Sequence, residues 1–179
     1  MKRSLIALGV VATLALSVTA AMAGPGGTDR PFKGNSSGTT TSSCTPAGDV
    51  CTSSSSGTHT SSHMGRGTYS IASTQTWGPG PMPDHGFSDC STSMTGSVTL
   101  VAANGDELSG SIETGSYVCE DVFGTRYVSH LEVKVTGGTG RFLAATGMYA
   151  VDGVSVDADF PTTPGEFSDT GSHAGTISY

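Results

Sequence analysis

The sequence has few charged residues, few aromatic residues and few stretches of the kind that form helices. Charged residues make up 13% and aromatic residues 7% of the 179 positions, with a single tryptophan. Runs rich in Leu, Lys, Glu and Ala are scarce after residue 25, which argues against a helical bundle and against an α/β enzyme with long crossover helices. Glycine accounts for 26 residues, and Ser and Thr are each about as frequent. This composition fits Thr-, Val- and Ser-rich strands joined by glycine turns, so we predict an all-β fold.

Basic residues are also rare. The formal net charge is −7, and only Arg66 and Arg126 are basic between Lys33 and Lys134. A nucleic-acid-binding protein needs a cationic stripe to displace counterions from phosphates, and an anionic membrane surface attracts the same kind of stripe. We therefore predict neither a nucleic-acid partner nor a membrane partner, and an acidic surface that keeps the protein soluble.

The N-terminal residues have the pattern of a signal peptide. Lys2 and Arg3 precede an apolar run from Leu5 to Val18, and Ala21-Met22-Ala23 forms an A-x-A cleavage site. A membrane anchor is the alternative, but the apolar run is shorter than the ~20 residues that a spanning helix needs. The pattern predicts a signal peptide at 1–23, a Gly-rich leader at 24–30, one β domain at 31–179 and export of the mature chain.

Four cysteines remain after this cleavage: Cys44, Cys51, Cys90 and Cys119. An even number in an exported chain predicts two disulfides. A zinc site is the rival, but the sequence has no C-x₂-C pair and no histidine at finger-like spacing. A two-residue turn at Asn104-Gly105 would pair residues whose numbers sum to 209, which places Cys90 opposite Cys119 and leaves Cys44 for Cys51.

That register places Leu100 and Leu108 on opposite faces of the hairpin. A three-residue loop with Gly105 as a bulge makes the two leucines neighbours instead. We predict the bulged turn, with a second irregularity nearer Cys90 and Cys119 that restores their approach.

Alternating and apolar patterns predict seven or eight strands, including 32–41, 66–73, 93–102, 107–118, 126–136, 148–156 and 168–179. The stretch 39–62 is nearly all Ser, Thr and Gly around two cysteines. We predict a stapled loop, that is, a loop between two strands closed by a disulfide, rather than a disordered linker. Prolines predict loops at 77–86 and 161–164. Strand 148–156 is apolar on both faces, which predicts that other parts of the protein cover it on both sides.

We expect a closed antiparallel barrel of about eight strands whose first and last strands pair, with a β-sandwich as the alternative. The terminal Tyr179 is typical of outer-membrane barrels, but their outward apolar band is missing.

The segment from Gly137 to Gly147 is the most distinctive in the chain. Gly137, Gly138 and Gly140 permit a sharp turn between adjacent strands, Phe142 is placed to plug the barrel end, and Gly147 lets the next strand start close to a neighbour. A phosphate-binding loop is the alternative, but it would need a following helix and a lysine or acidic partner.

This G-G-T-G-[KR]-F-x-x-A-x-G segment resembles dirigent proteins and the allene oxide cyclase-like barrels, and more closely a group of uncharacterised exported bacterial proteins of that superfamily. The similarity extends to Phe32-Lys33-Gly34, to His63-Met64-Gly65, and to 102–106 with Leu108. The loop from Cys44 to Cys51 and the proline-rich loop after Trp77 depart from the pattern. The resemblance implies a small barrel whose lumen holds an apolar ligand and steers cyclisation or coupling by shape. It transfers no catalytic residue.

Two histidine positions suggest metal binding at first sight. His59 and His63 are four residues apart, which is ~13 Å on a strand and too far for two ligands of one ion. We predict that both are solvent-exposed and that Asp84-His85 belongs to an ordinary polar turn. No metal and no cofactor is predicted.

The candidate catalytic residues are Glu113, Tyr117, His130 and Glu132. Inside a barrel, Glu132 would be a general base of raised pKa with His130 as its partner. The opposite face of strand 126–136 is apolar, and this favours a position outside. Glu113 and Tyr117 share a face of the neighbouring strand, and that face could likewise point into the lumen or outward. Two functions stay open: an exported barrel that binds or cyclises a small apolar metabolite, and a non-enzymatic secreted or cell-surface structural barrel.

Overall fold

The computed structural model describes residues 27–78, 89–121, 126–156 and 166–179, which form nine antiparallel strands and one 3₁₀ turn. The elements in chain order are β1 (Asp29–Cys44), β2 (Val50–Ser61), β3 (Gly65–Trp77), β4 (Asp89–Ala102), β5 (Glu107–Ile112), β6 (Tyr117–Glu120), β7 (Arg126–Gly138), η1 (Gly140–Phe142), β8 (Thr146–Val156) and β9 (Glu166–Ser178). β1 thus begins inside the predicted leader. The signal peptide, residues 79–86 of the first proline-rich loop and all of the second lie outside the described residues, and Trp77, predicted to begin the first loop, ends β3 instead.

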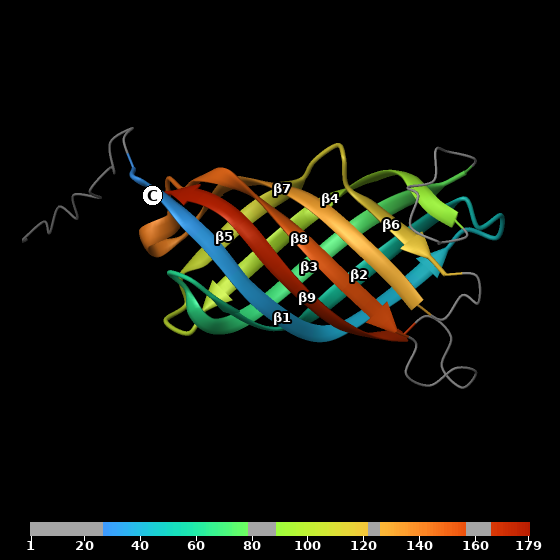
Figure 1. Cartoon of the computed structure of the whole chain (residues 1–179), viewed down its shortest axis with the longest axis horizontal. Coiled ribbons are helices and arrows are strands. Elements are labelled where there is room, and N and C mark those ends of the chain that lie inside the picture. Colours follow the sequence, from blue (N-terminus) through green and yellow to red (C-terminus); the bar gives the residue numbers. More distant parts are fainter. Residues whose placement is uncertain (1–26, 79–88, 122–125, 157–165) are drawn as a thin grey trace, which may run out of the picture.

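The sheet closes on itself as a barrel (Figure 1). Apart from β5 and β6, strands adjacent in sequence pair antiparallel, and β1 pairs with β9 over Asp29–Thr41 and Glu166–Ser178. β5 and β6 each pair with β4 and with β7, so they share one of eight positions around the barrel. This confirms the closed barrel and the pairing of first and last strands, and it excludes the sandwich.

The Ser/Thr/Gly stretch 39–62 is not a stapled loop, as the sequence suggested, but most of a long hairpin. β1 continues to Cys44 and β2 starts at Val50, with every residue from Gly34 to Cys44 paired to β2. The backbone of this hairpin is also paired to β9 on one side and to β3 on the other. Hydrogen bonds from both neighbours therefore order a stretch that has little apolar surface of its own.

The β4–β5 turn has the predicted bulged register. Leu100 lies opposite Leu108, and Gly105 has a φ of 85°. Beyond Ile112 the chain leaves the ladder over 113–116 and returns as β6, where Cys90 lies opposite Cys119. This break is the second irregularity that the sequence required. The disulfides are Cys44–Cys51 and Cys90–Cys119, as predicted.

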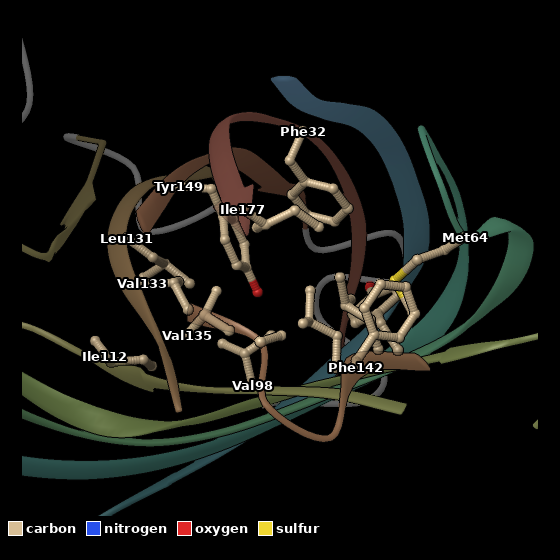
Figure 2. Packing of buried hydrophobic residues seen from close by; sticks show 14 of the residues in the cluster. Phe32, Met64, Val98, Ile112, Leu131, Val133, Val135, Phe142, Tyr149 and Ile177 are labelled. Carbon is tan, nitrogen blue, oxygen red and sulfur yellow. The ribbon is translucent and has the colours of Figure 1, made fainter. Parts of the chain in front are cut away.

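One end of the barrel is filled with apolar side chains (Figure 2). Phe142 in η1 is fully buried and closes this end, and the turn before it has positive φ at Gly137 (130°) and Gly140 (56°). Gly147 has a φ of 136°, and a Cβ there would lie 2.2 Å from the carbonyl oxygen of Thr176. The close approach of β8 to β9 therefore requires glycine at this position, as predicted.

The outward face of β8 is not covered, contrary to the sequence prediction. Met148 and Val156 are 51% and 44% exposed, whereas Tyr149 is buried in the barrel. Both faces of this strand are apolar in sequence, yet only the inward face has packing partners because the barrel has no second layer outside β8 in the described part of the chain.

Candidate functional site

The other end of the barrel contains an open cavity of about 480 Å³. It lies toward the β1–β2 hairpin, at the end of the molecule opposite η1 and the C-terminus (Figure 1). Apolar side chains in its deeper part come from four strands: Tyr69, Ile71, Met94, Leu131 and Val151. The interior of an eight-stranded barrel is just filled by side chains of ordinary size. Here it stays open because β1 and β2 point small side chains inward: Ser36, Thr40, Ser42, Ser53 and Ser55.

Asp169 is the carboxylate in the middle of this cavity. It lies on β9, one inward position from Phe167 and one from Gly171. The hydroxyl of Thr40 donates to its Oδ2, while its Oδ1 is buried without a hydrogen-bond partner in the part of the chain that the structure describes. Burial raises the pKa of the nearby Tyr69 phenol to about 12, and the negative charge of Asp169 adds to this shift. Tyr69 therefore stays protonated and neutral at physiological pH.

The mouth of the cavity combines aromatic rings with two further carboxylates. The Tyr127 hydroxyl donates to Glu120 Oε1 at 2.9 Å, and the rings of Tyr127 and Phe167 meet edge to face at 4.9 Å. Trp77 also lines the cavity, and its indole Nε1 is buried without a hydrogen-bond partner among the described residues. Asp89 accepts a hydrogen bond from the backbone N–H of Cys90 at 2.9 Å.

Between the cavity and the packed end lies a buried chain of two histidines and a serine. Ser61 Oγ is 2.7 Å from His59 Nδ1 and 2.8 Å from His173 Nε2, and all three side chains are at most 5% exposed. Burial lowers the pKa of His59, and burial together with the neighbouring His59 lowers that of His173 to about 4. Both rings are therefore neutral at physiological pH.

The prediction that His59 is solvent-exposed is wrong. His59 points inward like Ser61, and the ring fits because Gly67 on β3 leaves room: a Cβ at Gly67 would lie 2.8 Å from His59 Nε2. His63 lies past the end of β2, where its Nε2 donates to the carbonyl oxygen of Pro31 at 3.1 Å. Through Ser61, His59 is thus linked to His173, far away in sequence, and not to His63.

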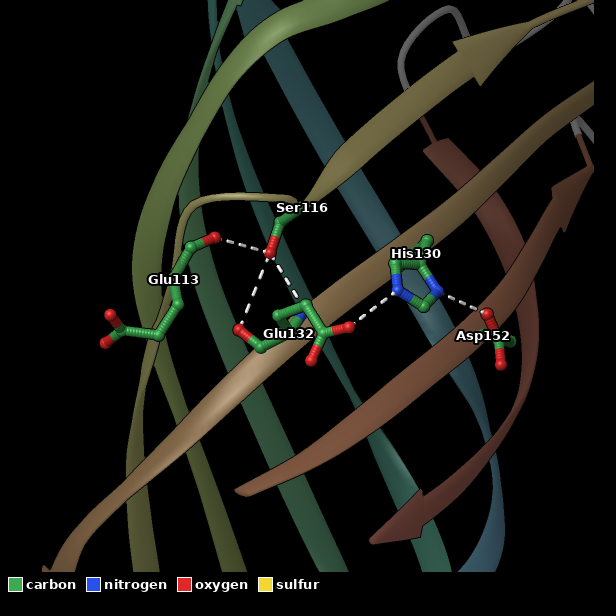
Figure 3. Close-up of polar contacts among 5 residues, drawn as sticks. All are labelled: Glu113, Ser116, His130, Glu132 and Asp152. Atoms are coloured by element: carbon green, nitrogen blue, oxygen red, sulfur yellow. Dashed lines mark hydrogen bonds and ion pairs between the residues drawn. The ribbon is translucent and has the colours of Figure 1, made fainter. Parts of the chain in front are cut away.

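None of the four candidate catalytic residues lines the cavity, and Figure 3 shows Glu113, His130 and Glu132 on the outer wall of the barrel. His130 Nδ1 is 2.7 Å from Asp152 Oδ1, its Nε2 is 3.1 Å from Glu132 Oε1, and its ring stacks on Tyr117 with centroids 5.5 Å apart. The hydrogen bond to Asp152, followed by that to Glu132, raises the pKa of His130 despite partial burial. Glu132 has a side chain 38% exposed, and Glu113 accepts a hydrogen bond from Ser111 outside the cavity. The structure brings His130, Glu132 and Tyr117 together, but on the outer wall, as the apolar opposite face of β7 indicated.

Sequence reasoning missed the residues that do face the cavity, notably Asp169, Glu120 and Trp77. A signal was present for two of them. Asp169 has the same strand parity as Ile177 and Phe167, and Trp77 has the same parity as Tyr69 and Ile71. In each strand the apolar members show which face is inward.

No family model, curated protein or solved structure matches this chain. In the described ranges, no helix is long and apolar enough to cross a membrane, and no group of three or more His, Cys, Asp or Glu side chains is placed to hold a metal ion.

Proposed function

We propose that the protein binds one small, mainly apolar organic molecule in the barrel lumen. The observation that carries this proposal is the cavity of about 480 Å³, which is open at one end and has apolar side chains in its deeper part. Its volume falls within the ~300–1,000 Å³ of ordinary small-molecule sites, which are also mainly apolar with a few polar groups. A barrel with a purely structural role would gain stability from filling this space, so we regard the structural barrel as the weaker candidate.

A cyclisation or isomerisation in the lumen would depend mainly on confinement of the ligand. Asp169 and Tyr69 are the groups available to it: a carboxylate with one unpartnered oxygen and a neutral phenol. The described lining includes no histidine and no lysine, and its cysteines Cys44 and Cys51 are joined as a disulfide. We therefore propose binding as the function and place any catalysis second to it.

We propose membership of the allene oxide cyclase-like superfamily on the resemblance of the segment from Gly137 to Gly147, and a closed antiparallel barrel is compatible with it. Two disulfides fit an oxidising, extracytoplasmic environment. Together with the Ala21-Met22-Ala23 pattern, they support export with cleavage after Ala23. Mass spectrometry of the secreted protein is expected to give Gly24 as the first residue. A secreted chain that retains Met1 would contradict this cleavage.

Binding is tested with N-phenyl-1-naphthylamine, a neutral apolar dye that fluoresces strongly when it leaves water. We expect saturable 1:1 binding by the native protein. Ser129→Phe places a large ring in the lumen from β7 and is expected to reduce the affinity at least tenfold. Thr136→Phe places the same ring on the exposed face of the same strand and serves as the matched control. Dye binding that is absent, or equal in both variants while both remain folded by circular dichroism, would contradict the proposal and favour a structural barrel.

A further inference from the structure

The lumen has charge of one sign. Asp89, Glu120 and Asp169 line it, and no Lys, Arg or His belongs to the described lining. A low-dielectric wall around three carboxylates concentrates a negative potential inside the cavity. Such a potential attracts cations into the lumen and repels carboxylates and phosphates.

Asp169 has one carboxylate oxygen, Oδ1, without a hydrogen-bond donor among the described residues. In the described part of the chain it forms no ion pair, and its only hydrogen-bond donor there is the Thr40 hydroxyl on Oδ2. The Thr40 hydroxyl also contacts Ser55. A buried carboxylate oxygen without a donor is costly, because water no longer solvates it and no protein group replaces the water. A positive charge that a ligand places in the lumen beside the Asp169 carboxylate offsets this cost.

The surroundings of Asp169 suit an organic cation better than a bare ion. Asp169 lies between the aromatic mouth and the apolar deeper part, and inward positions on one strand are roughly 6.5–7 Å apart. An ammonium group at Asp169 is therefore near the rings of Phe167 and Tyr127, whose faces attract cations. An apolar body attached to it reaches Ile71, Leu131 and Val151. A bare divalent ion would need several further oxygen ligands, and no group of three acidic or histidine side chains converges among the described residues.

We propose that the lumen selects a small organic cation, an ammonium group on an apolar body, with the ammonium paired with the Asp169 carboxylate. This inference rests on the proposed function, because it names the ligand class for the same cavity. A neutral alcohol of the same shape supplies the donor but leaves the carboxylate charge unpaired. A carboxylate of the same shape is repelled.

The sole tryptophan of the chain gives a direct measurement. Trp77 lines the cavity, so its fluorescence responds to a molecule that enters. Three probes with the same 4-phenylbutyl body are titrated at pH 7: 4-phenylbutylamine, 4-phenylbutan-1-ol and 5-phenylpentanoate. We expect the amine to bind at least tenfold more tightly than the alcohol, and the carboxylate to bind most weakly.

The role of Asp169 is tested with Asp169→Asn, which keeps an acceptor for Thr40 and removes the charge. The amine is expected to lose about tenfold in affinity, while binding of the alcohol changes less than twofold. Unchanged alcohol binding also shows that the variant lumen is folded. Asp152→Asn removes one charge from the outer wall and is the matched control, expected to leave all three affinities unchanged.

The outcomes separate the two proposals. Equal affinity of amine and alcohol in the native protein overturns the cation preference but leaves lumen binding intact. An amine affinity that is unchanged in Asp169→Asn overturns the assignment to Asp169. Failure of all three probes, together with failure of N-phenyl-1-naphthylamine, overturns the proposed function itself.

Discussion

His173 shows how the barrel interior affects a single titratable side chain. Burial, with a contribution from His59, lowers its pKa to about 4 from the ordinary 6.5. In the unfolded chain His173 therefore binds a proton below about pH 6.5, whereas in the folded protein it does so only below about pH 4. The stability that this histidine contributes is present above pH 6.5 and declines as the pH falls toward 4.

We predict that the free energy of unfolding falls between pH 6.5 and 4 by at most about 1 kcal/mol per pH unit from His173. His173→Gln keeps a polar group near Ser61 and is expected to flatten this dependence in urea titrations at a series of pH values. His130→Gln is the contrasting variant. The pKa of His130 is raised, so its contribution is present below 6.5 and is lost as the pH rises. An equally steep acid-side slope in native protein and His173→Gln would contradict the prediction.

Ser116 replaces backbone pairing at the break between β5 and β6. Its hydroxyl accepts from the backbone N–H of Glu132 at 2.9 Å and donates to the carbonyl oxygen of Glu113 at 2.8 Å (Figure 3). The side chain is 7% exposed, so water cannot easily take over these bonds.

We predict that Ser116→Ala lowers the free energy of unfolding by about 1–3 kcal/mol, since the buried N–H of Glu132 loses its acceptor. Ser111→Ala removes a hydroxyl from the same wall, where its hydrogen bond to Glu113 is half-exposed, and is expected to cost less than about 1 kcal/mol. Chemical denaturation measures both. Equal costs for the two variants would show that Ser116 does not hold the break.

At the scale of elements, local apolar alternation was the part of the fold that sequence could predict. Strand β7 alternates clearly, so the outward position of His130 and Glu132 followed from Leu131, Val133 and Val135. The Leu100–Leu108 and Cys90–Cys119 pairs together required the break that β5 and β6 show.

Strands without apolar alternation were harder to predict. β1 and β2 contain mostly Ser, Thr and Gly between residues 36 and 61. Their extended structure depends on the neighbours of the hairpin, and β1 pairs with β9, which is more than a hundred residues away in sequence. Non-local pairing of this kind leaves no trace in a short window of sequence. The inward orientation of Asp169 could be predicted from the parity of Phe167 and Ile177, but its neighbour Thr40 is a consequence of the β1–β9 register and could not.

The two disulfides lie at the end of the barrel that contains the cavity, where fewer side chains pack against one another. Cys44 and Cys51 line the cavity, and Cys90–Cys119 joins the first residues of β4 to β6. By the loop-entropy relation, the bridges contribute about 2–3 kcal/mol for the 7-residue separation and about 3–4 kcal/mol for the 29-residue separation.

We predict that the double variant Cys90→Ser/Cys119→Ser loses more unfolding free energy than Cys44→Ser/Cys51→Ser, because the longer loop gains more entropy in the unfolded chain. Denaturation under oxidising conditions measures both. The reverse order would show that the hairpin bridge acts mainly in the folded state, for instance by shaping the mouth.

At the scale of the whole molecule, the barrel has a packed half and an open half. Apolar side chains fill the half closed by Phe142, whereas Ser, Thr and Gly leave the other half available to a ligand. Packing against neighbours on all sides stabilises a side chain more than contact with a water-filled lumen does. Stability and binding are therefore expected to depend on different ends of the same strands.

This division predicts unequal costs for similar truncations. Leu108 is 1% exposed in the packed half, so Leu108→Ala is expected to lower the free energy of unfolding by about 2–5 kcal/mol. The truncation removes buried apolar surface and leaves an enclosed cavity. Ile71 is half-buried and faces the cavity, so Ile71→Ala only widens a space that already exists and is expected to cost about 1–2 kcal/mol. Urea denaturation at neutral pH gives both values, and the dye titration gives the converse ranking, since Ile71→Ala changes the lumen wall and Leu108→Ala does not. Equal stability costs would mean that the lumen end is as tightly packed as the core, and the division into two halves would be wrong.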